Sequence, residues 1–315
     1  MRYIFSGNMP AKTPEILMRA DDFTPISLLV TQLERKTLER YIEYKRIGYC
    51  DFIMMDSGAY SVFTGRASTT IDQYIDFINV AHKDVDVFVE LDTIPGEWGK
   101  SKKPEDYIVS ADKSWNDFLY TRERVCCPEK IMSVFHSGEP YEALKRTLEW
   151  TDSSGKHLDY IGISAAKDAD NKNRDTYMQD VRTVIDNSSN PDVGTHLFGT
   201  TALNVLKTIP CRSCDSTTHV RMAGFGCLIS PTFGQITVSS KGGTKGSAKT
   251  HFLHTADSKK IKKLEEELEP LKLTIKDVAD DPAARTAFNI RSILQLINTT
   301  YAYDSSNSLK RKSLI

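Results

Sequence analysis

The sequence predicts a (β/α)8 barrel, and three patterns in its first 235 residues indicate this fold. Short apolar runs alternate with amphipathic helical segments, which is typical of a parallel sheet with helical crossovers. Several runs end in a polar or acidic residue, and α/β barrels carry their catalytic groups at the carboxyl ends of the strands. No glycine-rich dinucleotide loop follows the first run, which disfavours an open doubly wound sheet. The runs that end in a polar group or glycine are 52–55, 85–91, 131–135, 160–163, 195–198 and 212–214, and two earlier predicted strands are 3–5 and 26–30.

Amphipathic segments follow most of these strands, and a different pattern begins past about residue 235. Residues 238–250 are rich in Lys, Gly and Ser and predict a flexible basic loop, with further helices expected at 259–268 and 282–297. The predicted barrel helices are 33–47, 71–81, 141–150, 177–185 and 202–206. We expect a catalytic barrel domain over 1–235, a basic loop with C-terminal helices packed on the barrel over 236–304, and a disordered tail over 305–315.

Composition is ordinary for a soluble globular protein, with 315 residues, 40% hydrophobic and 26% charged. The net charge of -1 means that an anionic partner must be held by a local basic patch. The six cysteines form no regular framework, which suits a reducing cytoplasm. The sequence shows no signal peptide pattern and no apolar stretch of membrane-spanning length. We expect a cytoplasmic protein without membrane contact, with a homodimer as one option for its oligomeric state.

Two isolated aspartates close predicted strands in the first third of the chain. Asp56 is followed by the small residues 57–59, which let a ligand approach the backbone closely, although Asp is also favoured as a helix N-cap. Asp92 can accept two adjacent hydrogen bonds, which matches the N–H donors on a guanine edge. Its alternative role is a cap or turn residue before Pro95.

Asp215 closes another predicted strand. A carboxylate there can attack a sugar carbon, as in retaining glycosidases, or form a salt bridge with Arg221. His136 also follows a strand, but a lone histidine is more often structural. Cys211 and Cys214 have zinc-like spacing, but zinc knuckles bring two such pairs and this chain has one, so we predict neither metal nor cofactor.

Taken together, these segments resemble the tRNA-guanine transglycosylase superfamily. Residues 56–60 are similar to its Asp-Ser-Gly-Gly-aromatic motif, which implies that Asp56 is the general acid/base and that Tyr60 stacks on the base. Asp92 corresponds to the base-recognition aspartate, and His136 stands where the family has a recognition glutamine.

The resemblance continues in the same order to about residue 226. The strand with Gly162 and Ser164 resembles the Gly-Leu-Ala strand that contacts the base, and Gly199 falls in a turn similar to Met-Gly-Val. Asp215 corresponds to the nucleophile, with Arg221 at the family's offset of an arginine. The family implies a (β/α)8 barrel that exchanges guanine for a 7-deazaguanine.

The chain departs from the tRNA enzymes in lacking any cysteine after Cys227, so their zinc subdomain is expected to be missing. Ala59, Ser61 and His136 also differ from the tRNA pattern. The chain looks more like the DNA-modifying branch, which is often phage-encoded and would then act in the host cytoplasm. The expected partners are DNA with a flipped or single-stranded guanine and a free 7-deazaguanine base, such as 7-cyano-7-deazaguanine.

The basic segments near the end of the chain are the predicted contacts to the nucleic-acid backbone, although a lysine run is also typical of a solvated loop. Three readings remain as alternatives: the same exchange on tRNA, a noncatalytic nucleic-acid-binding or partner subunit of the same fold, and a barrel glycoside hydrolase. The predicted backbone contacts are Lys241, Lys245, Lys249 and the basic residues 310–312.

Overall fold

A computed structural model describes residues 1–165, 171–199, 205–206, 209–239 and 251–302. Two compact units make up the chain. The first contains residues 1–6 and 26–216, and the second contains residues 7–25 and 217–315. Residues 217–235, which the sequence assigns to the barrel domain, group with the second unit. The predicted lysine contacts Lys241, Lys245 and Lys249 and the tail from 303 lie outside the described residues.

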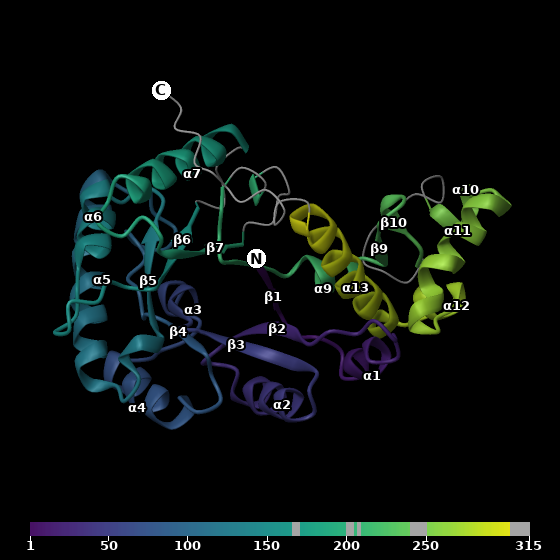
Figure 1. The fold of residues 1–315 in the computed structure, drawn as a ribbon, viewed down its shortest axis with the longest axis horizontal. Coiled ribbons are helices and arrows are strands. Elements are labelled where there is room, and N and C mark those ends of the chain that lie inside the picture. Colours follow the sequence, from purple (N-terminus) through teal and green to yellow (C-terminus); the bar gives the residue numbers. More distant parts are fainter. Residues whose placement is uncertain (166–170, 200–204, 207–208, 240–250, 303–315) are drawn as a thin grey trace. The chain divides into compact units, whose positions relative to one another are not determined.

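The first unit is a closed barrel of eight parallel strands, which confirms the predicted fold class (Figure 1). The last strand pairs with the first, in a register that places Asp215 opposite Ile4. The strands are β1 (Arg2–Ser6), β2 (Ile26–Thr31), β3 (Cys50–Asp56), β4 (Val87–Val89), β5 (Ile131–His136), β6 (Tyr160–Ser164), β7 (Gly194–Phe198) and β8 (Ser213–Ser216).

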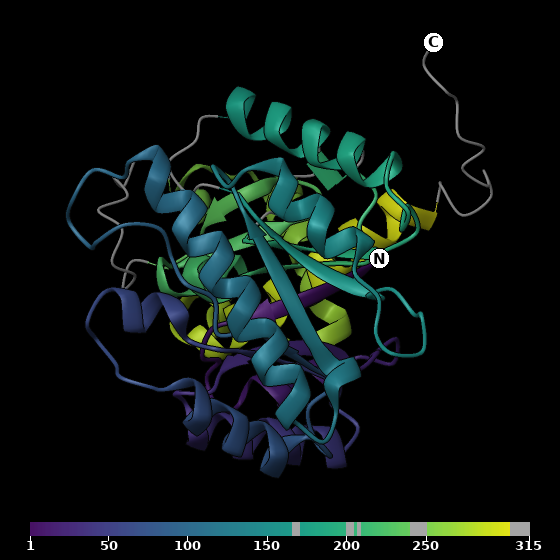
Figure 2. The same cartoon turned by 90° about the vertical axis from the view of Figure 1, so that its left-hand side faces the viewer.

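Helices cover the outside of this barrel, as Figure 2 shows from a second direction. One of them, α5 (Pro104–Arg124), was not predicted from the sequence. Its buried residues are mostly small or polar, among them Ser110, Ala111 and Ser114, so its apolar stripe is weak. The other helices of this unit are α2 (Arg35–Arg46), α3 (Ala59–Phe63), α4 (Ile71–Ala81), α6 (Tyr141–Glu149) and α7 (Asn171–Asp186), with a short 3-10 turn, η1 (Pro128–Lys130).

Side chains from successive strands fill the barrel interior, so the barrel is a packed core and not a pore. Ile4, Leu29, Met54, Val89 and Met132 are all buried in one cluster, with Phe198 packed against it. The packed side chains of this layer hold the strands in place, and with them the polar residues at the strand ends.

The second unit is built around its last helix, α13 (Pro282–Ala302). The buried amide of Asn289 accepts a hydrogen bond from Ile229 N and donates to the backbone oxygens of His219 and Cys227. These bonds fasten α13 to α9 (Thr218–Gly224) and to the antiparallel pair β9 (Cys227–Ser230) and β10 (Gly234–Thr237). The remaining elements are α1 (Thr13–Leu17), α10 (Phe252–Thr255), α11 (Ser258–Leu268), η2 (Glu269–Leu271) and α12 (Ile275–Asp280).

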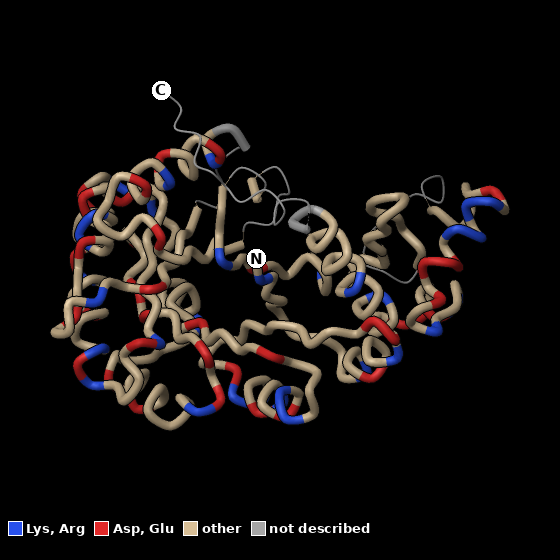
Figure 3. Tube along the Cα trace, viewed as in Figure 1, with Lys and Arg blue, Asp and Glu red and all other residues tan. Residues whose placement is uncertain are grey.

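Basic and acidic side chains are interspersed along the outer helices of the first unit (Figure 3). This mixture fits the near-zero net charge of the whole chain. Among the described helices, none combines the length and apolar character that crossing a bilayer requires.

Candidate active site at the carboxyl ends of the strands

The three predicted aspartates lie at the same end of the barrel. All eight strands are parallel, so their carboxyl ends meet at one mouth. Asp56 ends β3, Asp92 follows β4, and Asp215 lies near the end of β8. The charges of both Asp56 and Asp92 help raise the pKa of the buried Tyr74 phenol, after the larger effect of burial, which indicates that these two carboxylates lie near the same ring.

Asp215 is a buried carboxylate held by groups from two neighbouring strands. Its Oδ2 accepts a hydrogen bond from Ser6 Oγ at 3.0 Å, and its Oδ1 accepts one from Gly199 N at 2.7 Å. His196 Nε2 lies 3.5 Å from Oδ1. Burial alone would raise the pKa of Asp215, but His196, Gly199 and Ser6 outweigh it and hold the pKa below its ordinary value. Asp215 is therefore ionised at neutral pH, as a nucleophile must be.

Asp92 and His136 form a close pair on the other side of the mouth. His136 Nε2 lies 2.7 Å from Asp92 Oδ2, and both side chains are largely buried. The backbone N–H of His136 donates to Glu139 Oε2 at 3.0 Å. No hydrogen bond from a described residue reaches Asp92 Oδ1, so this oxygen remains available to a ligand.

The histidine of this pair has a perturbed pKa. Burial lowers the pKa of His136, but the hydrogen bond to Asp92 and the charges of Asp92 and Glu139 outweigh it, so the pKa lies above its ordinary value. The charge of Lys102 acts weakly in the opposite direction. The bond to Asp92 therefore favours the protonated, imidazolium form of His136.

Asp56 orders the turn that leads into α3. Its Oδ1 accepts a hydrogen bond from Gly58 N at 2.9 Å. Gly58 has φ +79°, and a Cβ there would lie 2.8 Å from Leu33 Cδ1 and 2.9 Å from Thr31 Oγ1. Only glycine fits this position, so the small residues after Asp56 serve the turn itself. The helix N-cap is Gly58, not Asp56.

Tyr60, the predicted stacking residue, lies on α3 with 42% of its surface exposed. Its ring meets the ring of Trp98 nearly at a right angle, with centroids 6.1 Å apart. Phe63 meets the same indole at 6.0 Å. An aromatic cluster of Tyr60, Phe63 and Trp98 therefore stands beside the loop of Asp56.

The remaining predicted residues have mostly backbone roles. A Cβ on Gly162 would lie 2.6 Å from Phe198 Cε2, so Gly162 makes room for Phe198 in the barrel interior. The carbonyl of Ser164 accepts a hydrogen bond from Ser137 N at 2.8 Å. Arg221 is exposed on α9 of the second unit.

The thiols of the cysteine pair are buried or half-buried. Burial raises the pKa of the Cys211 thiol to about 12, which disfavours the thiolate that a metal would need. In the described parts of the chain, no three His, Cys, Asp or Glu side chains come together in a way that could hold a metal ion.

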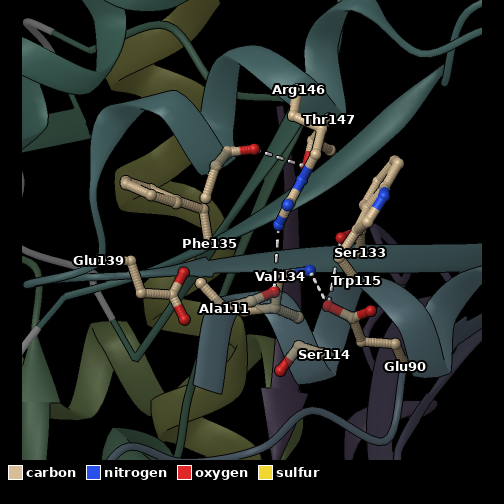
Figure 4. A pocket seen from close by; sticks show the side chains of 11 residues that line it. Glu90, Ala111, Ser114, Trp115, Ser133, Val134, Phe135, Glu139, Arg146 and Thr147 are labelled. Atoms are coloured by element: carbon tan, nitrogen blue, oxygen red, sulfur yellow. Dashed lines mark hydrogen bonds between the residues drawn. The ribbon is translucent and has the colours of Figure 1, made fainter. Parts of the chain in front are cut away.

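A small cavity lies between β5 and helices α5 and α6 (Figure 4). Its volume is about 20 Å³, enough for about one water molecule and far below the size of a purine pocket. Three buried polar atoms on its lining residues have no hydrogen-bond partner: Glu90 Oε2, Glu139 Oε1 and Arg146 Nε. Burial raises the pKa values of both Glu90 and Glu139, and it raises that of Glu90 well above its ordinary value. Glu139, which lines the cavity, connects it to the Asp92–His136 pair through the hydrogen bond from the backbone N–H of His136.

Sequence reasoning missed four residues of this arrangement: Ser6, Glu90, Glu139 and His196. His196 and Glu90 each interrupt an apolar run, and a polar side chain inside a strand buried on both faces needs a partner. That signal was present in the sequence. The bonds of Ser6 to Asp215 and of Glu139 to His136 depend on the barrel register and on the turn after β5.

Neither protein-family models nor curated protein sequences give a match to this chain. What the site can do therefore follows from its own residues.

Proposed function

We propose that the chain is a pentosyltransferase that exchanges guanine in DNA for a free 7-deazaguanine. The observation that carries the proposal is the state of Asp215: an ionised, buried carboxylate fixed by Ser6 and Gly199 at the mouth of a barrel. The resemblance of residues 50–226 to the transglycosylase superfamily gives this carboxylate its proposed target, the C1′ of a nucleoside.

Asp215 serves as the nucleophile. Its carboxylate attacks C1′ of the deoxyribose, the C1′–N9 bond breaks, and the bonding electron pair leaves with guanine. The N–H of Gly199 and the hydroxyl of Ser6 fix the direction of the carboxylate, which reduces the entropy lost on reaching the transition state.

Asp56 serves as the general acid and base. It gives a proton to the departing guanine and takes one from N9–H of the incoming deazaguanine. That base then attacks C1′, and the ester bond to Asp215 breaks. One N-glycosidic bond replaces another, so the exchange needs no cofactor or energy source.

Asp92 and His136 serve to recognise the base. Asp92 Oδ1 accepts hydrogen bonds from the purine edge, while Oδ2 is held by His136. Tyr60 lies next to this mouth on α3 and supplies an exposed ring for stacking. Ser164 and Gly199 bring strand-end backbone to the same mouth, while Gly162 lies in the middle of β6.

A base-exchange assay tests the proposal. The protein is incubated with an isotopically labelled 7-deazaguanine and either a guanine-containing DNA oligonucleotide or tRNA, and the nucleosides are analysed by mass spectrometry. We expect label in the DNA nucleosides. Label only in tRNA would assign the same chemistry to RNA, and label in neither would overturn the proposal.

A further inference from the structure

The loop between β4 and α5 carries an exposed aromatic ring and several lysines beside the candidate site. Residues 93–103 leave the barrel at the carboxyl end of β4, directly after Asp92. Trp98 in this loop is 57% exposed, whereas the other two tryptophans, Trp115 and Trp150, pack against each other. Tyr60 beside it is also exposed, so the two rings form an exposed aromatic patch and not a single exposed residue.

Two observations connect this loop to both sides of the site. Trp98 meets Tyr60 on the side of Asp56, with ring centroids 6.1 Å apart. Lys102 lies against Gly96, where an added Cβ would come within 3.3 Å of Lys102 Cγ, and its charge acts on His136. The loop therefore borders the Asp56 turn with its indole and the Asp92–His136 pair with its lysine.

The charge of the loop is suited to an anionic polymer. Residues 98–103 contain three lysines and no acidic residue. Lys100 is bonded to Glu97 at 2.5 Å, but Lys102 and Lys103 form no ion pair with a described residue. Lys102 Nζ lies 5.8 Å from the centre of the Tyr107 ring, a contact that leaves its charge without an acidic partner. Exposed aromatic rings beside lysines are the combination with which proteins bind single-stranded nucleic acid.

We propose that this loop is a nucleotide subsite in which Trp98 stacks on the base next to the reacting guanosine and Lys102 contacts a backbone phosphate. The inference rests on the proposed function, because it names where the strand continues once one guanosine has entered the mouth. A strand in this place passes over the same rim that carries Tyr60 and Asp92.

Binding of a fluorescently labelled, single-stranded DNA oligonucleotide with one guanine tests the subsite. Trp98→Ala is expected to weaken binding roughly tenfold or more, because stacking of one base on an aromatic side chain has effects of this order. Trp98→Phe retains a ring and should restore most of the affinity. Lys102→Ala should reduce the slope of log affinity against log salt by about 0.7, the value for one phosphate contact on a single strand.

Two matched variants serve as controls. Tyr120→Ala removes another exposed aromatic residue, one that lies near the carboxyl end of α5 with Arg124 over its ring at 3.6 Å. Lys83→Ala removes an exposed lysine that follows α4. The ends of α4 and α5 lie at the opposite end of the barrel, since the helices run antiparallel to the strands. Neither control should change the affinity.

Binding of free guanine to the same proteins distinguishes the nucleotide subsite from the proposed function, because the free base needs the barrel mouth and not the loop. Guanine binding that is unchanged in Trp98→Ala, with weakened oligonucleotide binding, supports the subsite. Equal oligonucleotide affinity in wild type and both loop variants overturns the subsite and leaves the proposed function standing. A wild-type protein that binds neither ligand overturns both. If Trp98→Ala instead dissociates an oligomer without weakening oligonucleotide binding, the indole is a protein contact and the inference is wrong.

Discussion

His136 Nε2 and Asp92 Oδ2 lie 2.7 Å apart, at the carboxyl ends of the neighbouring strands β5 and β4. This bond fixes the carboxylate of Asp92 and leaves its other oxygen to a ligand. It also makes the net charge of the pair depend on the protonation of His136. The side chain of Glu139 accepts a hydrogen bond from the backbone N–H of His136, so the backbone of the pair is fixed as well.

The first prediction concerns the pH dependence of this pair. The pKa of His136 is raised in the folded protein, so its contribution to stability is fully present below its unfolded value of about 6.5 and is lost as pH rises through the folded pKa. His136→Gln keeps a donor but cannot titrate. We expect the difference in free energy of unfolding between wild type and His136→Gln to be largest near pH 6 and to shrink toward pH 9, as measured by urea denaturation.

The control adds Asp92→Asn to wild type and to His136→Gln and compares the free energies of unfolding of these two proteins in the same way. Without the carboxylate, burial becomes the largest effect and lowers the pKa of His136, so the difference between histidine and glutamine should no longer shrink as pH rises and should change in the opposite direction. A difference that stays constant with pH in the presence of Asp92 would contradict the assignment of a charged pair.

A second prediction concerns the buried Glu90. Its pKa is raised well above its ordinary value by burial, so the folded protein keeps a proton that the unfolded chain releases above about pH 4.3. Wild type should therefore lose stability relative to Glu90→Gln as pH rises from 4.5 to 7, with a slope of up to about 1.4 kcal/mol per pH unit. Urea denaturation across this range measures the slope.

The matched control is Glu142→Gln, the same substitution at a glutamate whose side chain is 80% exposed on α6. It should leave the pH profile of wild type nearly unchanged. A Glu90→Gln profile that runs parallel to wild type would show that Glu90 is ionised in the folded protein.

A high-resolution crystal structure is expected to place a water molecule between Glu90 Oε2, Glu139 Oε1 and Arg146 Nε, since buried polar atoms at a cavity of this size are normally bridged by water.

A third prediction uses two glycines with similar backbone conformations. Gly58 has φ +79° and close neighbours at 2.8 and 2.9 Å, whereas Gly65 has φ +68° and nothing within 4 Å of an added Cβ. Gly65→Ala should lower the free energy of unfolding by about 1 kcal/mol, from backbone strain alone. Gly58→Ala should lower it by about 3 kcal/mol, because the contacts with Leu33 and Thr31 add to the strain.

Gly58→Ala should also displace the Asp56 carboxylate, which is bonded to the N–H of this residue. In the base-exchange assay we therefore expect a lower rate for Gly58→Ala than for Gly65→Ala when both proteins are folded. Equal stability of the two variants would contradict the close packing around Gly58.

Much of the barrel could be predicted from the sequence because parallel strands buried on both faces give continuous apolar runs. The predicted run 131–135 became β5 (Ile131–His136), and 71–81 matches α4 (Ile71–Ala81). Thr70 and Gln73 form a capping box there, which gives the start of α4 a clear local signal. By contrast, α5 buries mostly small and polar residues, so it has no clear apolar stripe. The strands β9 and β10 are four residues each, which is too short for a periodic pattern.

The site could be predicted only in part. The strand-end positions of Asp56, Asp92 and Asp215 follow from where the apolar runs stop. The groups that tune them come from other strands and turns: Ser6 from β1, His196 from β7 and Glu139 from the turn after β5. Those contacts are set by strand order and register, which a single sequence does not encode locally.

Trapping of a covalent intermediate tests the central claim, that Asp215 attacks a nucleoside. The protein is mixed with a guanine-containing single-stranded oligonucleotide, denatured and analysed by mass spectrometry. We expect an adduct on Asp215 in wild type and in Asp159→Asn, an exposed residue that precedes β6, and no adduct in a folded Asp215→Asn. An adduct of equal yield in Asp215→Asn, or attachment of the oligonucleotide to another residue in wild type, would contradict the mechanism.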